Sequence, residues 1–234
     1  MSDFRGFPQA GAQSTSVDLG LRAYMIRVYN YMSIGLVITG LVSYATLNSG
    51  LMPVLFNSPL KWVVLLAPLA MVMFLSFRIQ TLSFGAAQIS FWVFSALMGL
   101  SLSPIALVYT GASIAKVFFI TAAAFGSLSL YGYTTKRDLT GFGSFLFMGL
   151  IGIIIAGVVN IFLQSSAMSF ALSVLGVLIF TGLTAWDTQQ IKSMYYMSSG
   201  EASIGRSAIM GALRLYLDFI NLFTSLLNLF GDRR

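Results

Sequence analysis

Long apolar runs separated by short polar segments dominate this sequence. Each run comes close to the ~20 residues that a helix needs to cross the hydrocarbon core of a bilayer. The connections are short, which favours antiparallel hairpins, except for a polar stretch from Met197 to Arg206. The pattern predicts an all-α polytopic membrane protein with seven transmembrane helices. The runs lie at about residues 28–47, 61–79, 85–109, 115–133, 142–163, 169–196 and 207–230.

Composition supports the bilayer and narrows the chemistry. Hydrophobic residues make up 57% of the chain and charged residues 9%, against roughly 25% charged residues in a soluble domain. Cysteine and histidine are absent, which excludes disulfides, thiolate nucleophiles, Cys/His metal sites and haem ligation by histidine. We expect no cofactor. A pH sensor would have to be a carboxylate, because histidine, the usual titrating group near neutral pH, is missing.

The positive charges indicate topology rather than nucleic-acid binding. With the N-terminus inside, eight Lys and Arg residues fall in inner segments and four in outer ones, which favours a cytoplasmic N-terminus and an external C-terminus. The polar start of the chain lacks the apolar core of a signal peptide. We expect residues 1–22 to form a flexible cytoplasmic tail, followed by a transmembrane domain over residues 23–232.

Two of the predicted spans carry small residues at regular spacing. Ser95, Gly99 and Ser103 recur every four residues on the third span, and Ala122 and Gly126 share a face of the fourth. Small residues allow transmembrane helices to approach closely. Both faces are therefore predicted to pack against other helices.

The last span carries an aspartate near its middle, Asp218. A charge there costs roughly 2.5–3.5 kcal/mol on insertion scales, so its surroundings must compensate. Polar residues and glycine recur around it with a period of about 3.5 residues, on a face that must point into protein or water. One explanation is that this face only hydrogen-bonds to other helices, with Arg214 neutralising Asp218. Such contacts need no ionisable groups. We therefore favour the other explanation, that the face lines an ion pathway. The stripe comprises Ser207, Gly211, Arg214, Asp218, Asn221, Ser225 and Asn228.

A second unusual carboxylate, Asp187, lies near the inner end of the sixth span, on one face with Thr184. It is about ten residues from the helix end, and Asp218 is eleven residues beyond Ser207 on the next helix. The hairpin is therefore predicted to bring the two carboxylates to similar depth. Two carboxylates in a dry site cannot both ionise at low cost, and they provide a titration near neutral pH. The alternative is an interfacial aspartate that only ends a helix.

Arg78 ends the second span, on the same predicted side of the membrane as Asp187. It can be an anchor whose side chain reaches the interface, or it can form a salt bridge with Asp187.

Three motifs resemble the Bax inhibitor-1 (transmembrane Bax inhibitor motif) family, and its bacterial members most. They are the stretch of residues 99–146, which begins GLSLSPIALVYTG, and the segments AWDTQQIK and LYLDFINLF. The resemblance covers the chain from about residue 22 to its end. It implies six helices packed around a central C-terminal helix, and a pH-controlled calcium leak through the pair Asp187 and Asp218. It also implies that Arg78 is a latch that pairs with Asp187. The connection between the last two motifs, which includes SSGEASIGRS, is longer than the resemblance leads us to expect.

Together with the polar stripe, the resemblance implies a pH-sensitive cation channel in a bacterial inner (cytoplasmic) membrane, which leaks calcium and binds protons. Asp187 and Asp218 are the predicted sensor and calcium ligands, since calcium prefers oxygen ligands. The alternative is a regulator that transports nothing and binds a quality-control protease or acts in a stress pathway. An intramembrane aspartyl protease is not expected, because WDTQ and YLDF do not resemble its YD and GxGD motifs. The residues predicted to line the pathway are Thr184, Arg214, Asn221, Ser225 and Asn228.

Overall fold

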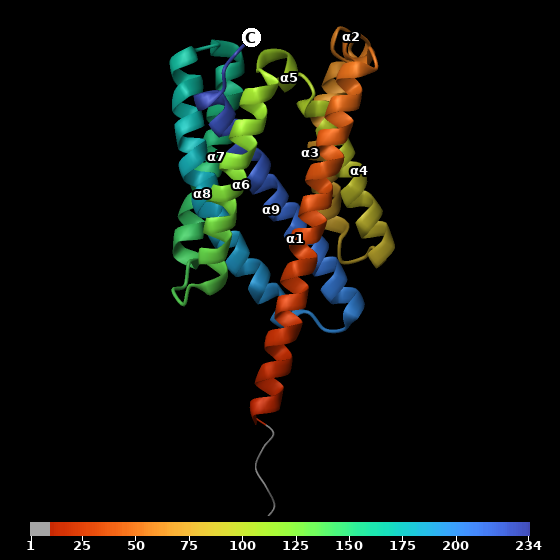
Figure 1. Ribbon diagram of the computed structural model, residues 1–234, viewed down its shortest axis with the longest axis vertical. Coiled ribbons are helices and arrows are strands. Elements are labelled where there is room, and N and C mark those ends of the chain that lie inside the picture. The colour runs from red at the N-terminus through yellow and green to blue at the C-terminus, as the bar shows by residue number, and fades with distance from the viewer. Residues whose placement is uncertain (1–9) are drawn as a thin grey trace, which may run out of the picture.

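The computed structural model describes the chain from residue 10 to residue 234, and its side chains from residue 19 onward. Helices are the regular elements of this part of the chain, joined by short turns, and the predicted all-α class is confirmed (Figure 1). Seven of its helices are long and apolar enough to cross a membrane, as the sequence predicts. The elements are α1 (Ala10–Asn48), α2 (Leu51–Phe56), α3 (Leu60–Arg78), α4 (Phe84–Leu102), α5 (Ile105–Val108), α6 (Gly111–Thr134), α7 (Thr140–Leu163), α8 (Ser166–Met197) and α9 (Glu201–Phe230).

The first helix begins much earlier than predicted. The flexible tail was expected to reach residue 22, but the chain is already helical at Ala10, and only residues 1–9 lie outside the described part. Leu21, Tyr24, Met25 and Val28 are all buried, and their spacing places them on one face of a helix. Packing of this face explains why α1 begins before the first apolar run of the sequence.

The third predicted span is interrupted near its outer end. Instead of one helix over residues 85–109, α4 ends at Leu102 and α5 begins at Ile105, with Pro104 at the N-cap position between them. Proline has no backbone N–H and cannot donate the hydrogen bond that would continue α4. The predicted third span is therefore present from Phe84 to Val108, but it consists of two helices.

The turn between α8 and α9 is much shorter than the predicted polar connection. Only residues 198–200 separate the two helices. Gly200 has a φ of 81°, a conformation that glycine adopts without strain. Ser198, the first residue of the turn, and Ser207 of α9 share a hydroxyl–hydroxyl hydrogen bond of 2.8 Å. Residues 201–206, predicted as part of the connection, thus form the first turns of α9.

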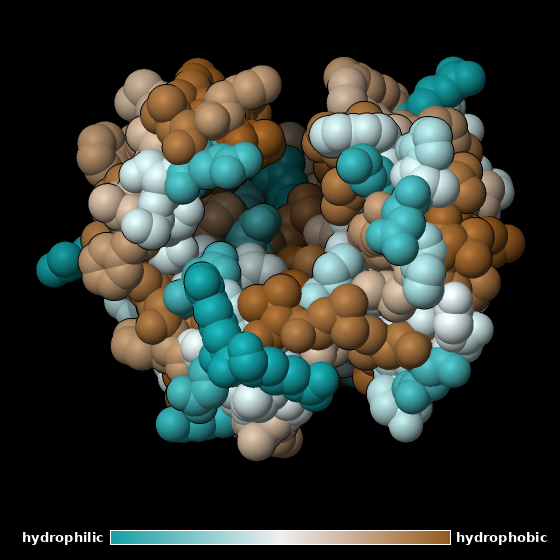
Figure 2. Space-filling model, turned by 90° about the horizontal axis from the view of Figure 1, so that it is seen from above, coloured by the Kyte–Doolittle hydropathy of each residue, from teal (hydrophilic) through white to brown (hydrophobic). Residues whose placement is uncertain are grey.

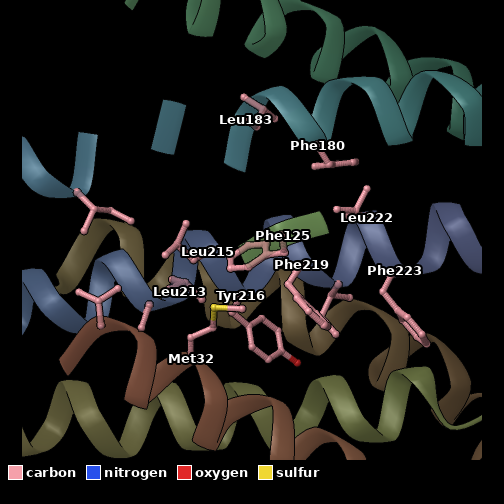
Figure 3. Packing of buried hydrophobic residues seen from close by; sticks show 14 of the residues in the cluster. Met32, Phe125, Phe180, Leu183, Leu213, Leu215, Tyr216, Phe219, Leu222 and Phe223 are labelled. Carbon is pink, nitrogen blue, oxygen red and sulfur yellow. The ribbon is translucent and has the colours of Figure 1, made fainter. Parts of the chain in front are cut away.

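The last helix is the most buried of the seven spans. Within the most apolar stretch of each span, 67% of α9 is buried, compared with 6% of α7 and at most 28% of any other span. α9 packs against α1, α3, α4, α6 and α8, whereas α7 packs against α8. Figure 3 shows side chains of α9 such as Tyr216 and Leu222 pointing toward different neighbouring helices. The expected ring of six helices around α9 stays a prediction, because α7 joins the bundle through α8.

The two faces of small residues behave differently. A Cβ added to Gly99 of α4 would lie 2.6 Å from the carbonyl oxygen of Thr39 on α1, so these helices approach as closely as the sequence predicts. A Cβ added to Gly126 of α6 would meet nothing within 4 Å. The expected helix contact at Gly126 is absent, and this face borders a groove instead.

Candidate functional site

A cavity of about 1370 Å³ with both polar and apolar side chains in its lining, here called the vestibule, lies between the α3–α4 side of the bundle and the α7–α8 side, with α9 along its floor. Figure 2 shows the molecule from its upper end in Figure 1, where a hollow with hydrophilic side chains lies between two largely apolar masses. The residues of the α9 stripe that line the vestibule are Arg214, Asp218, Asn221, Ser225 and Asn228. The structure thus brings these predicted residues onto one wall.

One end of the vestibule is formed by polar residues at the end of α7, the start of α8 and the connection between them. Asn160, Gln164, Ser166 and Ser169 line it there. On the sequence-based topology this is the external end of the bundle. Farther along α8 and α9, towards the turn that joins them, the cavity wall includes Asp187, which completes the polar lining.

Asp187, Arg214 and Asp218 form a compact group, here called the acid triad. Arg214 Nη1 lies 3.4 Å from Asp187 Oδ1 and donates a hydrogen bond to it within a salt bridge. Asp187 and Asp218 lie near enough for their charges to interact. Two neighbouring buried carboxylates repel each other when both are ionised. The sharing of one proton between them stays a prediction.

Burial makes the protonation state of the triad energetically important. Asp218 is 4% exposed and Asp187 8% exposed. Asp218 Oδ2 is buried without a hydrogen-bond partner among the described residues. A charged group at such a position must be paired or neutralised, because burial of an isolated charge costs several kcal/mol. Arg214 supplies one positive charge for the two carboxyl groups.

The register of the α8–α9 hairpin determines which residues meet. Ile191 packs on Gly211, where an added Cβ would lie 3.0 Å from Ile191 Cγ2. One turn farther from the hairpin, Arg214 reaches Asp187. Asp218 follows Arg214 by four residues, which is about 6 Å along the helix. The predicted similar depth is thus approximate, because Asp218 lies about one turn beyond the level of Asp187 and Arg214.

Thr184 does not line the vestibule, although the sequence predicts it there. It is 0% exposed, and its hydroxyl donates a hydrogen bond of 2.7 Å to the carbonyl oxygen of Phe180 in its own helix. A residue three positions before Asp187 is rotated from it by about 60° around a helix. This rotation turns Thr184 into the packed interior, so it is not among the predicted residues that line the vestibule.

No group of three or more acidic residues that could hold a metal ion occurs in the described part of the chain. The predicted calcium ligands Asp187 and Asp218 are therefore a pair. Calcium takes 6–8 oxygen ligands, so an ion at this pair would keep water in most of its coordination sphere. Arg214 also competes with a cation for Asp187. The arrangement suits an ion in transit better than a resident ion.

Arg78 does not form the predicted salt bridge with Asp187. Its side chain is exposed at the end of α3, and it takes part in no ion pair among the described residues. Arg214 forms the salt bridge with Asp187 instead. The physical reason is the helix arrangement: α3 packs against α4 and α9, whereas α8 packs against α6, α7 and α9. The helices that carry Arg78 and Asp187 thus lie on opposite sides of the vestibule.

Replacing Arg78 with alanine is expected to leave the pH dependence of transport unchanged, because its side chain does not touch the acid triad. Only the amount of inserted protein should fall, if the side chain anchors α3 at the interface. Calcium flux in vesicles, divided by the amount of reconstituted protein, measures this. A raised flux per molecule would show that Arg78 is a latch after all.

The sequence gives no signal for a contact at the mouth of the vestibule. The N–H of Arg234 donates to the carbonyl of Val108 (2.9 Å), and the N–H of Thr110 donates to the carbonyl of Asp232 (3.1 Å). Tyr109 donates a hydrogen bond of 2.7 Å to Asn228 Oδ1. The segment after α9 is thus tied to the connection between α5 and α6, and Asn228 is held in place.

Comparison with known proteins agrees with the motifs. Residues 21–234 match the family model described as inhibitor of apoptosis-promoting Bax1. The chain is 49% identical over 219 residues to the inner membrane protein YbhL of Escherichia coli K12, covering 92% of this chain and 94% of the relative. It is 46% identical over 235 residues to an uncharacterized protein of Rickettsia prowazekii, with both chains fully covered. It is 47% identical over 249 residues to one of Caulobacter vibrioides, again with both fully covered. The chain belongs to the Bax inhibitor-1 family of multi-pass membrane proteins.

Proposed function

We propose that the chain is a pH-sensitive cation leak channel, permeable to calcium, in a bacterial inner membrane with its N-terminus in the cytoplasm. The observation that carries this proposal is the vestibule, whose lining includes the two carboxyl groups and the guanidinium of the acid triad. Ionisable residues inside a membrane protein are costly, and they mark ion and proton pathways. A helix that served only for packing would not need them.

The charge of the acid triad gives the proposed pH response its sign. When Asp187 and Asp218 share a proton, one carboxylate and the guanidinium of Arg214 leave the triad neutral. When that proton leaves, the triad carries one net negative charge. A cation in the vestibule is attracted only by the second state, and the attraction is strong because the site is poorly hydrated. We therefore expect cation flux to rise with pH.

Packing beyond the triad supports a regulated pathway. Towards the α8–α9 turn, Ile191 is packed against Gly211, and Ala208, Ile209 and Ala212 are 0% exposed. An ion can therefore pass this end only when α8 and α9 separate. The salt bridge between Asp187 and Arg214 joins the two helices immediately above this packed region. Loss or gain of the shared proton changes the charges at this junction, which is how protonation would control the opening.

Calcium flux into vesicles tests the proposal. Purified protein is reconstituted into vesicles that contain a calcium dye, and the initial rate is measured between about pH 5 and pH 8. We expect flux above that of protein-free vesicles, rising with pH. The absence of protein-dependent flux at every pH would contradict the channel proposal.

A regulator that transports nothing is the second candidate, and one feature favours it. The N-terminal part of α1 extends beyond the other helices (Figure 1), where a partner such as a membrane protease could bind. Removal of this extension separates the two functions. A channel should keep its flux in vesicles, whereas a regulator should show no flux with or without the extension and should lose its partner. We do not propose an enzyme, because the aspartate motifs do not match those of intramembrane proteases.

A further inference from the structure

We propose that a groove between α1 and α6 binds an acyl chain of an anionic phospholipid, with the phosphate at the end near Arg22. This α1–α6 groove has a volume of about 920 Å³ and has Phe219 of α9 on its floor. Such a volume is typical of a ligand pocket. The groove is separate from the vestibule, because Phe219 and Asp218 point to different sides of α9.

Small side chains on both helices create the groove. Gly40 of α1 and Gly126 of α6 both line it, and a Cβ added to either would meet nothing within 4 Å. Ala122 lies one turn before Gly126 on the same wall. The two helices contact each other through a hydrogen bond between Tyr29 and Ser129. The small-residue face of α6 thus leaves space instead of receiving another helix.

The shape and lining of the groove fit an acyl chain. Along α1 it extends from Arg22 to Gly40, which is about 27 Å of helix and close to the ~30 Å thickness of the hydrocarbon core. Its floor includes Met25, Met32 and Phe125, which are buried. A long apolar channel that faces the bilayer is filled by a flexible hydrocarbon chain. The surrounding bilayer therefore supplies acyl chains that can occupy the groove.

Positive charge at one end of the groove selects the headgroup. Arg22 and Tyr133 line that end. Lys192 Nζ donates a hydrogen bond of 3.0 Å to the carbonyl of Tyr133 and lies 5.2 Å from the centre of its ring. Lys136 and Arg137 follow α6 there and are exposed. Basic pockets between transmembrane helices bind anionic lipid headgroups, and arginine matches the geometry of phosphate.

Spin-labelled lipids test the proposal with the full chain in phosphatidylcholine vesicles. Trace phosphatidylglycerol or phosphatidylcholine, each labelled on an acyl chain, reports the fraction of lipid immobilised by the protein. We expect immobilised phosphatidylglycerol to be favoured about fivefold, the preference that one nearby basic side chain confers. Gly126→Phe should fill the groove and remove this preference. Arg22→Gln should reduce it while phosphatidylcholine is still immobilised.

A matched control places the same bulk elsewhere on the lipid-facing surface. Gly152 of α7 also has nothing within 4 Å of an added Cβ and does not line the groove. Gly152→Phe should keep the lipid preference. Equal immobilisation of the two lipids, or an unchanged preference in Gly126→Phe, would overturn the proposal. Occupation of the groove by a second copy of this chain would also overturn the proposal. Because the chain has no cysteine, a single Leu130→Cys on the groove wall would then form disulfide-linked dimers, and we expect none.

Discussion

Asparagine in place of Asp218 is expected to remove most of the pH response of calcium flux. The substitution deletes one proton-binding site while it keeps the size and hydrogen-bonding capacity of the side chain. With Asp218 neutral, the Asp187–Arg214 pair has no second carboxyl group with which to share a proton. Flux should become nearly constant between about pH 5 and pH 8.

The control for this variant is a carboxylate outside the membrane. Asp138, between α6 and α7, is hydrogen-bonded to the backbone N–H of Thr140 through Oδ1 (2.9 Å). Hydrogen bonding from Thr140 holds the pKa of Asp138 below its ordinary value, so this group stays ionised throughout the tested range. Asp138→Asn should therefore preserve the pH profile. An unaltered profile in Asp218→Asn would remove Asp218 from the sensor.

Glutamine in place of Arg214 is expected to raise cation flux at the acidic end of the range and to move the remaining pH-dependent rise to higher pH. Without the guanidinium, the triad is negative even when the carboxyl groups share a proton, so this state already attracts a cation, and the triad becomes doubly negative when that proton leaves. The proton is therefore held more tightly. Loss of one adjacent positive charge should move the midpoint by ~1–3 pH units. Flux titrations of wild type and variant measure the displacement.

Arg206 provides the matched control, because it is on the same helix as Arg214 but does not line the vestibule. Arg206→Gln should leave the midpoint in place. If both variants shifted the profile equally, the effect would come from the overall charge of α9 and not from the triad.

The seven spans and the polar stripe of α9 could be predicted from the sequence, because hydropathy and helical period are local properties. The partner of Asp187 could not. Arg78 and Arg214 are equally plausible by residue type, and only the packing of α8 against α9 selects Arg214. That register depends on the short turn at residues 198–200. The residues on either side of this turn are polar and resemble a longer loop in the sequence, although both helices continue through them.

Small residues show the same limit of local patterns. Gly99 and Gly126 occupy similar small-residue faces, yet one contacts the backbone of α1 and the other borders the open α1–α6 groove. Spacing reveals that a helix can be approached closely, but the arrangement of all the helices decides whether another helix comes there. The contact between Tyr109 and Asn228 joins residues 119 positions apart and is likewise invisible to a local pattern.

The coupling between Asp187 and Asp218 tests the central claim most directly. Flux is titrated for wild type, Asp187→Asn, Asp218→Asn and the double variant in the same vesicles. If the two groups share one proton they act as a unit, and their effects cannot add. Each single substitution should then abolish most of the pH response, and the double variant should resemble the singles. Additive changes from the two single variants would mean independent sites and would contradict the shared-proton mechanism.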